Sequence, residues 1–207
     1  MLFHKQNAKR IPWNKGKLVG QKLPLKPEEI WAIRIHLEMG AKTRDLALFN
    51  LALDSKLRGC DLVKLTVKDV LNGNEIKNRS SVFQQKTKQP VKFEITLKTQ
   101  HALSSWIDCA GLCMVDYLFP SSKRSNYHLS TQQYARIVNR WVESIGLDKS
   151  AYGTHSLRRT KAAIIYKQTK NLRAIQILLG HSKLESTVRY LGVEIDDALE
   201  LSENIDV

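Results

Sequence analysis

Hydrophobic positions recur with a helical period over most of the chain. In residues 26–40 the apolar side chains follow this spacing, Pro27 suits a first helical turn, and Gly40 suits a C-terminal stop. The same spacing continues from Leu46 to Leu53. The stretch "CDLVKLTVKDV" then predicts a short helix and a turn. Residues 26–70 are therefore expected to be mainly helical.

The period changes to two in the middle of the chain, in residues 80–97. Val82 and Phe83 are followed by a polar stretch from Lys86 to Pro90, and Val91, Phe93 and Ile95 then alternate with polar residues. Alternation on both sides of a polar tip is typical of a β-hairpin. We expect one small antiparallel hairpin here.

Helical periodicity returns after the hairpin. It predicts helices over residues 97–112, 134–146, 155–168, 171–180 and 184–191. Ser130 and Gln133 form a capping-box pattern before the second of these, and Thr154 or a neighbour is expected to cap the third. The fold class is therefore mainly α with a small antiparallel β-hairpin, an α+β domain.

The two ends of the chain differ from this domain in composition. Residues 1–25 carry six lysine or arginine residues, among them Lys15 and Lys17, no acidic residue, and Trp13. We expect a basic arm that orders on DNA. Residues 26–193 would form the domain. Residues 194–207 would form an acidic tail whose apolar residues contact a neighbouring subunit.

Charge and cysteine usage narrow the functional class. The 207 residues carry a formal net charge of +13, which indicates a polyanionic partner, and 43% of them are hydrophobic, enough for a core. Three cysteines without a paired framework favour an intracellular setting, where we expect them to be small buried residues. Cys109 and Cys113 lack accompanying ligands, so zinc is not expected. We expect no secretory signal and no membrane span.

The residues that stand out suit metal-independent chemistry on a phosphodiester. Such a reaction needs cations on the non-bridging oxygens, an in-line nucleophile, a base and an acid. His155 and Arg158 lie on one face at a helix start, which is also an anion-binding end. Further candidates for these roles are Arg58, Lys86, Lys88, Arg159, His181 and Tyr190. Each is unremarkable alone, and the order in which they occur is what carries the interpretation.

That order resembles the catalytic set of the tyrosine recombinases, the phage-integrase family. "LRGCDL" resembles the family's first arginine box, with Asp61 where a glutamate is usual. "THSLRRTKA" resembles its H-x-L-R box, and "LLGHSKLESTVRYLGV" resembles its box that ends in the tyrosine. The similarity extends from about Thr43 to Val193 and implies the catalytic-domain fold of this family.

The resemblance also implies a role for each residue in DNA strand cleavage and rejoining. Tyr190 would attack the phosphate and leave a 3′-phosphotyrosine, Arg58 and Arg158 would hold the phosphate, and His155 and His181 would assist. Lys86 would protonate the leaving oxygen, although Lys88 competes with it, because Gln85 and Thr87 replace the usual glycines. Lys88, Arg159, Lys15 and Lys17 are expected to contact DNA. No cofactor and no metal is implied.

The resemblance leaves several points open. Tyr152 and Tyr166 are alternative nucleophiles that we interpret as packing residues. The partners implied are double-stranded DNA, further subunits in a tetramer on two DNA sites, and accessory DNA-bending proteins. The setting would be the cytoplasm, at the bacterial nucleoid. A topoisomerase-like relaxing enzyme and a non-catalytic DNA-binding regulator remain rival interpretations. The basic arm would partly replace the family's separate DNA-clamping domain, since only about forty residues precede Thr43.

Overall fold

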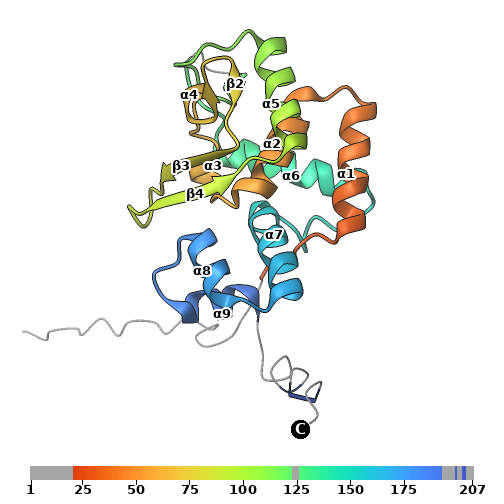
Figure 1. Ribbon diagram of the computed structural model, residues 1–207. Coiled ribbons are helices and arrows are strands. Elements are labelled where there is room, and N and C mark those ends of the chain that lie inside the picture. The colour runs from red at the N-terminus through yellow and green to blue at the C-terminus, as the bar shows by residue number, and fades with distance from the viewer. Residues whose placement is uncertain (1–20, 123–125, 193–198, 200–201, 204–207) are drawn as a thin grey trace, which may run out of the picture.

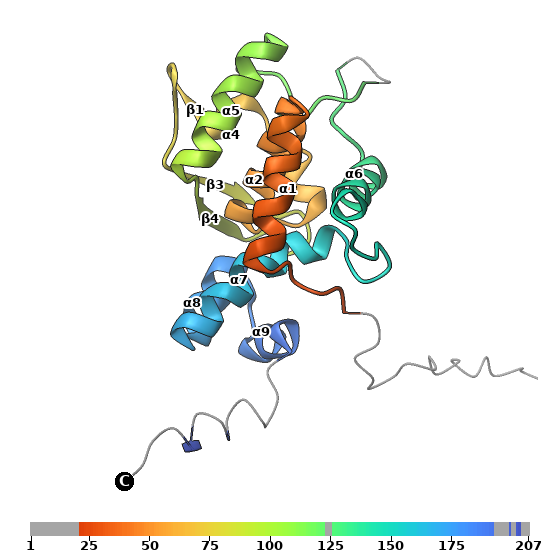
Figure 2. The ribbon, with the colours of Figure 1, turned by 90° about the vertical axis from the view of Figure 1, so that its right-hand side faces the viewer.

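The computed structural model describes residues 21–122, 126–192, 199 and 202–203, and this part of the chain is mainly helical (Figures 1 and 2). The prediction of a mainly α fold with a small antiparallel sheet is confirmed. In chain order the elements are α1 (Pro27–Met39), α2 (Thr43–Ser55), α3 (Gly59–Leu62), α4 (Val67–Val70), β1 (Leu71–Asn72), β2 (Glu75–Ile76), β3 (Arg79–Phe83), β4 (Pro90–Glu94), α5 (Leu97–Ala110), α6 (Thr131–Ser144), α7 (Thr154–Thr169), α8 (Leu172–Leu179) and α9 (Leu184–Leu191). None of the helices in the described ranges is long and apolar enough to span a bilayer.

Helix α2 is the centre of the main core. All its residues from Ala47 to Ser55 are buried, because α1, α5, α7 and strand β4 surround it. The Phe49 ring meets the edge of Trp141 on α6 with ring centroids 5.3 Å apart, an edge-to-face arrangement that aromatic pairs favour. The polar residues of this enclosed helix have partners: Asn50 accepts from Arg34, and Asp54 accepts from Thr99.

A second and smaller apolar cluster joins the three C-terminal helices. Ala162 of α7 and Ile175 and Leu179 of α8 are fully buried in it, and Tyr190 of α9 packs against them. Figure 1 shows α7, α8 and α9 grouped below the body that α1, α2 and α5 form. The last two helices are therefore attached mainly through α7, with a further contact between α8 and β4.

Strands β3 and β4 form the predicted hairpin, in a register that pairs Ser80 with Phe93 and Val82 with Val91. Val91 and Phe93 are buried, as the alternation predicts. A second hairpin, β1–β2, was not predicted. Its signal is the Gly73-Asn74 pair, which forms the two-residue turn, with Gly73 at a φ of +60°.

The helix ends agree with the predicted caps in part. Ser130 accepts a hydrogen bond from the Gln133 amide at 3.1 Å, and Gly153, next to Thr154, is the cap residue of α7. The expectation of buried cysteines was wrong for Cys109 and Cys113, which are both exposed. These two residues lie where α5 ends and just beyond it, on the outside of the molecule.

The segment before α1 packs on the helical body. The Leu23 amide donates to the Ala151 carbonyl at 3.0 Å, the Leu25 amide donates to Thr160 Oγ1 at 2.9 Å, and Leu25 belongs to the main core. Residues 21–25, which the composition groups with the arm, are thus continuous with the domain. Trp13, Lys15, Lys17 and nearly all of the acidic tail lie outside the described residues.

Candidate active site

Arg158 is the most enclosed of the predicted site residues. Helix α7 projects it inward, where it is only 2% exposed. Its Nη1 donates to the Lys56 carbonyl at 2.5 Å and its Nη2 donates to the Leu179 carbonyl at 2.7 Å. Two backbone acceptors on different elements therefore fix the guanidinium plane.

Arg58 approaches the same place from the start of α3. It is the N-cap residue of that helix, it is half-buried, and its Nη1 donates to Gln84 Oε1. Asp61 follows on α3, and its Oδ1 accepts the Gln85 amide at 2.9 Å. The aspartate in the first arginine box therefore ties that box to the end of β3.

The two candidate lysines, Lys86 and Lys88, both lie exposed at the β3–β4 tip. Lys88 adopts a φ of +53°, and its amide donates to the Gln84 carbonyl at 2.8 Å. Lys86 is close enough to His155 to contribute to the lowering of its pKa. No corresponding effect of Lys88 on His155 is found.

Both histidines are held mainly neutral. Desolvation, followed by repulsion from Arg158 and Arg58, lowers the pKa of His181 to about 4 and also lowers the pKa of His155. His181 Nδ1 lies 3.1 Å from the hydroxyl of Thr187, which is fully buried. This contact orients the His181 ring.

Tyr190, on helix α9, lies close to the guanidinium groups of Arg158 and Arg159. Its ring meets His181 edge-on with centroids 5.4 Å apart and an interplanar angle of 84°, and Arg158 Cζ lies 5.9 Å from its centroid. Its hydroxyl is buried and forms no well-aligned hydrogen bond with a described residue. Burial raises the pKa of Tyr190 to about 12, although the charges of Arg158 and Arg159 oppose this shift.

Arg159, for which the resemblance implies a contact with DNA, is largely enclosed by the protein. It is 7% exposed, its Nη1 donates to the Lys22 carbonyl at 2.7 Å, and its Cζ lies 5.6 Å from the Tyr190 ring centroid. Gln21 in turn donates to the Arg189 carbonyl at 2.6 Å. Arg159 and the segment before α1 therefore enclose the tyrosine helix.

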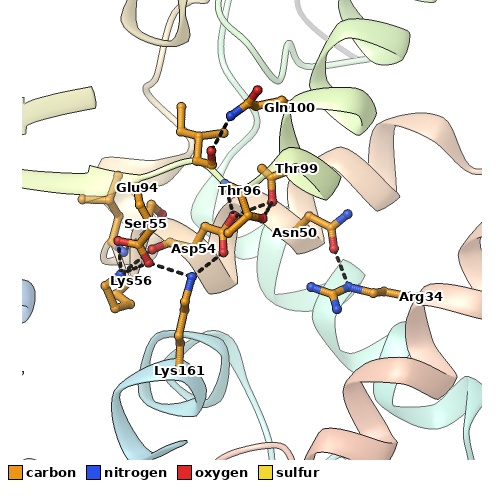
Figure 3. Close-up of polar contacts among 12 residues, drawn as sticks. Arg34, Asn50, Asp54, Ser55, Lys56, Glu94, Thr96, Thr99, Gln100 and Lys161 are labelled. Atoms are coloured by element: carbon orange, nitrogen blue, oxygen red, sulfur yellow. Dashed lines mark hydrogen bonds and ion pairs between the residues drawn. The ribbon is translucent and has the colours of Figure 1, made fainter. Parts of the chain in front are cut away.

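A partly buried ion-pair network joins the end of α2, strand β4 and helix α7, as Figure 3 shows. Lys56, which is fully buried, binds both carboxylate oxygens of Glu94 at 2.8 and 2.9 Å. Lys161 of α7 binds Glu94 and Asp54, each at 2.6 Å. Because Lys56 also supplies the carbonyl that Arg158 binds, this network fixes one end of the arginine.

The two alternative tyrosines pack in apolar surroundings. Tyr152 is 8% exposed in the main core, and its hydroxyl donates to Glu29 Oε1 at 3.3 Å. Tyr166 packs against the second apolar cluster. Their positions agree with the interpretation as packing residues.

The predicted residues therefore converge from four places in the chain. The start of α3, the β3–β4 tip, α7 and the α8–α9 segment bring together fixed guanidinium groups, an ammonium group, two neutral imidazoles and a phenol. This set suits the oxygens of a phosphodiester and an attacking oxygen. In the described ranges no three His, Cys, Asp or Glu side chains gather in a way that would hold a metal ion.

Three supporting residues were missed by sequence reasoning: Lys56, Gln84 and Thr187. Lys56 acts through its carbonyl and Gln84 is an uncharged residue at a strand end, so neither gave a chemical signal. Thr187 was part of the tyrosine box but was not singled out. Only the spacing within that box could have pointed to it.

Comparisons with known proteins agree with this arrangement. The model of the phage integrase family matches residues 25–195. The chain is 31% identical over 169 residues to the Bacillus subtilis (strain 168) protein named "Probable integrase/recombinase YoeC", and the match covers 82% of this chain and 88% of that protein. The chain spans about half the length of two other curated relatives named tyrosine recombinases, 56% and 49%.

Solved structures show the same fold. The XerA recombinase superposes with a TM-score of 0.72 at 21% identity, over 88% of this chain and 64% of that one. XerH bound to its difH substrate superposes with a TM-score of 0.70 at 19% identity, over 90% of this chain and 55% of that one. With the family model covering most of the sequence, the chain belongs to the phage integrase family of tyrosine recombinases.

Proposed function

We propose that this protein is a site-specific DNA recombinase or integrase that cuts and rejoins strands through a 3′-phosphotyrosine intermediate. The observation that supports this most directly is the convergence of Arg58, Arg158, His181 and Tyr190 from separate sequence boxes. The curated relatives named integrase and recombinase act as further support. XerH, one of the structural neighbours, is described in complex with its DNA site, which supports DNA as the partner.

In the first step the Tyr190 oxygen attacks the scissile phosphorus. The new oxygen–phosphorus bond forms as the bond from phosphorus to the 5′ oxygen breaks. Arg58 and Arg158 hold the non-bridging oxygens, where charge accumulates in the transition state, and His181 donates a further hydrogen bond. The phosphate remains linked to the enzyme, so its bond energy is conserved for rejoining.

Two proton transfers accompany this step. The phenol proton passes to His155, which can accept it because its lowered pKa keeps the ring mainly neutral at pH 7. The departing 5′ oxygen takes a proton from Lys86. Lys88 is the alternative donor at the same hairpin tip. Lys86 is favoured because its charge contributes to the lowered pKa of His155.

Rejoining reverses the same transfers with a 5′ hydroxyl from a second strand. Exchange between two duplexes requires one active tyrosine for each strand cut, so we propose a tetramer on two DNA sites, with accessory DNA-bending proteins as further partners. The acidic tail, residues 194–207, would contact a neighbouring subunit. The reaction would take place at the nucleoid in a bacterial cytoplasm.

Contacts to the rest of the duplex come from basic residues around the site. Lys88 at the hairpin tip and Lys15 and Lys17 of the arm would bind phosphates of the backbone. For Arg159 we now propose a contact with Tyr190 in place of DNA, because it is enclosed beneath the tyrosine ring.

The test is capture of the covalent adduct. Wild type, Tyr190→Phe and Tyr152→Phe proteins are expressed in bacteria that carry candidate host DNA, the cells are lysed in strong detergent, and protein-linked DNA is sequenced. We expect adducts in wild type and Tyr152→Phe but not in Tyr190→Phe, with DNA ends that accumulate at one sequence. Equal recovery from Tyr190→Phe would refute the assignment of the nucleophile.

Two further assays, plasmid relaxation and DNA binding, separate the rival functions. Relaxation of a supercoiled plasmid that lacks the recovered site would indicate a topoisomerase-like enzyme. Tight DNA binding without an adduct from any variant would indicate a non-catalytic regulator. Neither result agrees with site-specific recombination.

A further inference from the structure

Gln84 has no place in the reaction, yet it is a fully buried polar residue in the middle of the site. It follows the last residue of β3 and precedes the turn that carries Lys86, and its exposed fraction is 0%. A primary amide carries no charge and transfers no proton near neutral pH. A buried amide must instead satisfy its hydrogen bonds within the protein.

The side chain of Gln84 makes these bonds to three separate parts of the site. Its Oε1 accepts from Arg58 Nη1 and from Thr87 Oγ1, the latter at 2.9 Å. Its Nε2 donates to the Leu179 carbonyl at 3.2 Å. One amide therefore joins the first arginine, the lysine turn and the end of α8.

The Leu179 carbonyl extends this connection to the second arginine. Arg158 Nη2 donates to the same oxygen at 2.7 Å. Arg58, Gln84, Leu179 and Arg158 thus form one continuous chain of hydrogen bonds between the two guanidinium groups. His181 lies two residues after Leu179, so a fixed Leu179 carbonyl also restricts the position of His181.

The backbone of Gln84 holds the hairpin tip. Its amide donates to the Gln89 carbonyl at 3.0 Å and its carbonyl accepts the Lys88 amide at 2.8 Å. These two bonds close the turn in which Lys86 and Thr87 lie. The residue that anchors Arg58 therefore also sets the position of the lysine turn.

The Gln84 side chain also lies close to Gly180. A Cβ atom on Gly180 would lie 3.1 Å from Gln84 Nε2 and 3.3 Å from Oε1. The amide thus lies directly against the glycine of the third box. A neutral amide also leaves the charge of Arg58 free for a phosphate, whereas a carboxylate there would partly neutralise it.

We propose that Gln84 is a positioning residue that holds Arg58, the Lys86 turn and the Leu179–His181 segment in one fixed arrangement for the scissile phosphate. The effect of Gln84 on catalysis rests on the proposed function. Its structural content, the fixed orientation of Arg58, does not depend on that function.

Three single variants test the proposal in the full-length protein. Gln84→Met has a similar size but makes no hydrogen bonds. Gln84→Glu keeps both acceptor bonds, loses the donor to Leu179 and adds a negative charge. Gln85→Met changes the neighbouring glutamine, whose side chain donates to the Cys60 carbonyl and accepts from Lys64. It is the matched control.

The first measurement uses the protein without DNA. Nitrogen-15 NMR of the arginine side chains reports how freely each guanidinium group rotates. We expect restricted rotation of Arg58 in wild type and Gln85→Met, free rotation in Gln84→Met, and restricted rotation in Gln84→Glu, where a carboxylate pairs with it. Restricted rotation of Arg58 in a folded Gln84→Met protein would overturn the proposal.

The second measurement is adduct yield at the DNA sequence recovered with wild type. We expect Gln84→Met to lower the yield by about 100-fold, since small misplacements of reacting groups have effects of this size. Gln84→Glu should also lose most of the yield although Arg58 stays ordered, and Gln85→Met should stay within about threefold. Binding to a random 30-base-pair duplex should change little in all three, because most phosphate contacts remain.

The two measurements distinguish a wrong proposed function from a wrong positioning role for Gln84. Absence of any adduct from wild type would contradict the proposed function, and the NMR comparison would still decide whether Gln84 positions Arg58. Normal adduct yield from Gln84→Met would overturn the positioning role while the proposed function stood. Thermal denaturation shows whether each variant is folded. If Gln84→Met is unfolded, Gln84→Glu provides the test, because we expect it to keep Arg58 ordered while it lowers the adduct yield.

Discussion

Tyr190 lies in an environment that opposes its own reaction when no DNA is bound. Its hydroxyl is buried without a well-aligned partner among the described residues, and burial raises the pKa of the phenol to about 12. A phenolate is therefore rare at neutral pH until the surroundings change. The two arginines near its ring favour the phenolate but do not outweigh burial. Transfer of the phenol proton to the mainly neutral His155, with a phosphate in place for attack, is what would make this residue a nucleophile.

Removing the Tyr190 hydroxyl should not destabilise the protein. A side-chain hydrogen bond with Arg158 opposes the rise in the pKa of Tyr190, but this bond is poorly aligned and does not offset the desolvation of the hydroxyl. We therefore expect Tyr190→Phe to raise the free energy of unfolding by about 1 kcal/mol while it abolishes adduct formation. Urea denaturation of both proteins at pH 7 measures the difference. Tyr152→Phe is the control, because its hydroxyl bonds to Glu29 and its loss should be mildly destabilising. A less stable Tyr190→Phe would show that the hydroxyl has a partner.

His181 should make DNA binding stronger at lower pH. Its pKa is about 4 in the free protein, because of desolvation and the nearby arginines, and a bound phosphate would raise it. The complex then takes up protons that the free protein does not, so affinity rises as pH falls from 7.5 to 5.5. Fluorescence anisotropy with a fixed duplex at constant ionic strength measures this for Tyr190→Phe. We expect a weaker pH dependence when His181→Gln is added, and an identical slope would contradict the assignment.

At the scale of elements, the site depends on how α8 and the β3–β4 hairpin meet. Gly180 ends α8 with a φ of +64°, and a Cβ there would lie 2.4 Å from Val91 Cγ2 of β4. Because β4 lies so close to Gly180, the carbonyl of the preceding residue, Leu179, accepts hydrogen bonds from both Gln84 and Arg158. The glycine of the third box is thus required twice, for its backbone conformation and for the close approach of the strand.

Two glycine substitutions separate these requirements. Gly111 also has a positive φ, +59°, but a Cβ there would meet nothing within 4 Å. We expect Gly111→Ala to lose about 1 kcal/mol from the backbone conformation alone. Gly180→Ala should lose about 1 to 3 kcal/mol more, as overpacking does, together with adduct yield. Thermal denaturation compares the two, and equal losses would mean that β4 moves aside freely.

At the scale of the whole molecule, the segment before α1 links the basic arm to the tyrosine helix. Residues 21–25 bond to α7, to the loop before it, and to the backbone of α9. An arm bound along DNA would therefore act directly on the surroundings of Tyr190. Residues 21–25 therefore pack as part of the domain.

Deletion of residues 2–20 should weaken DNA binding without unfolding the domain. The deleted segment contains five lysine or arginine residues. For every phosphate that the shortened protein no longer binds, the slope of log affinity against log salt should become shallower by about 0.9. Binding is measured at low and at high NaCl concentration, and replacement of the five basic residues by glutamine is the matched control for charge. Unchanged affinity and slope would exclude a DNA-binding role for the arm.

The sequence by itself determined which chemistry is present and most of the local structure. Local patterns carried this information: the 3.6-residue period defined helices such as α6 and α9, the alternation in residues 91–95 defined β4, and the boxes around Arg58, Arg158 and Tyr190 identified the family. Caps and turn residues set where the elements end, because they act on adjacent residues. The short β1–β2 hairpin was missed, since two-residue strands leave almost no alternation to detect.

Only the tertiary structure decided how these groups are held. Arg159 is enclosed beneath Tyr190, and Lys56 is buried against Glu94, although charged residues are normally expected at the surface. Gln84 joins residues that are 26 and 95 positions away from it in the sequence. Such contacts depend on how separate elements pack, and no local period or spacing encodes them.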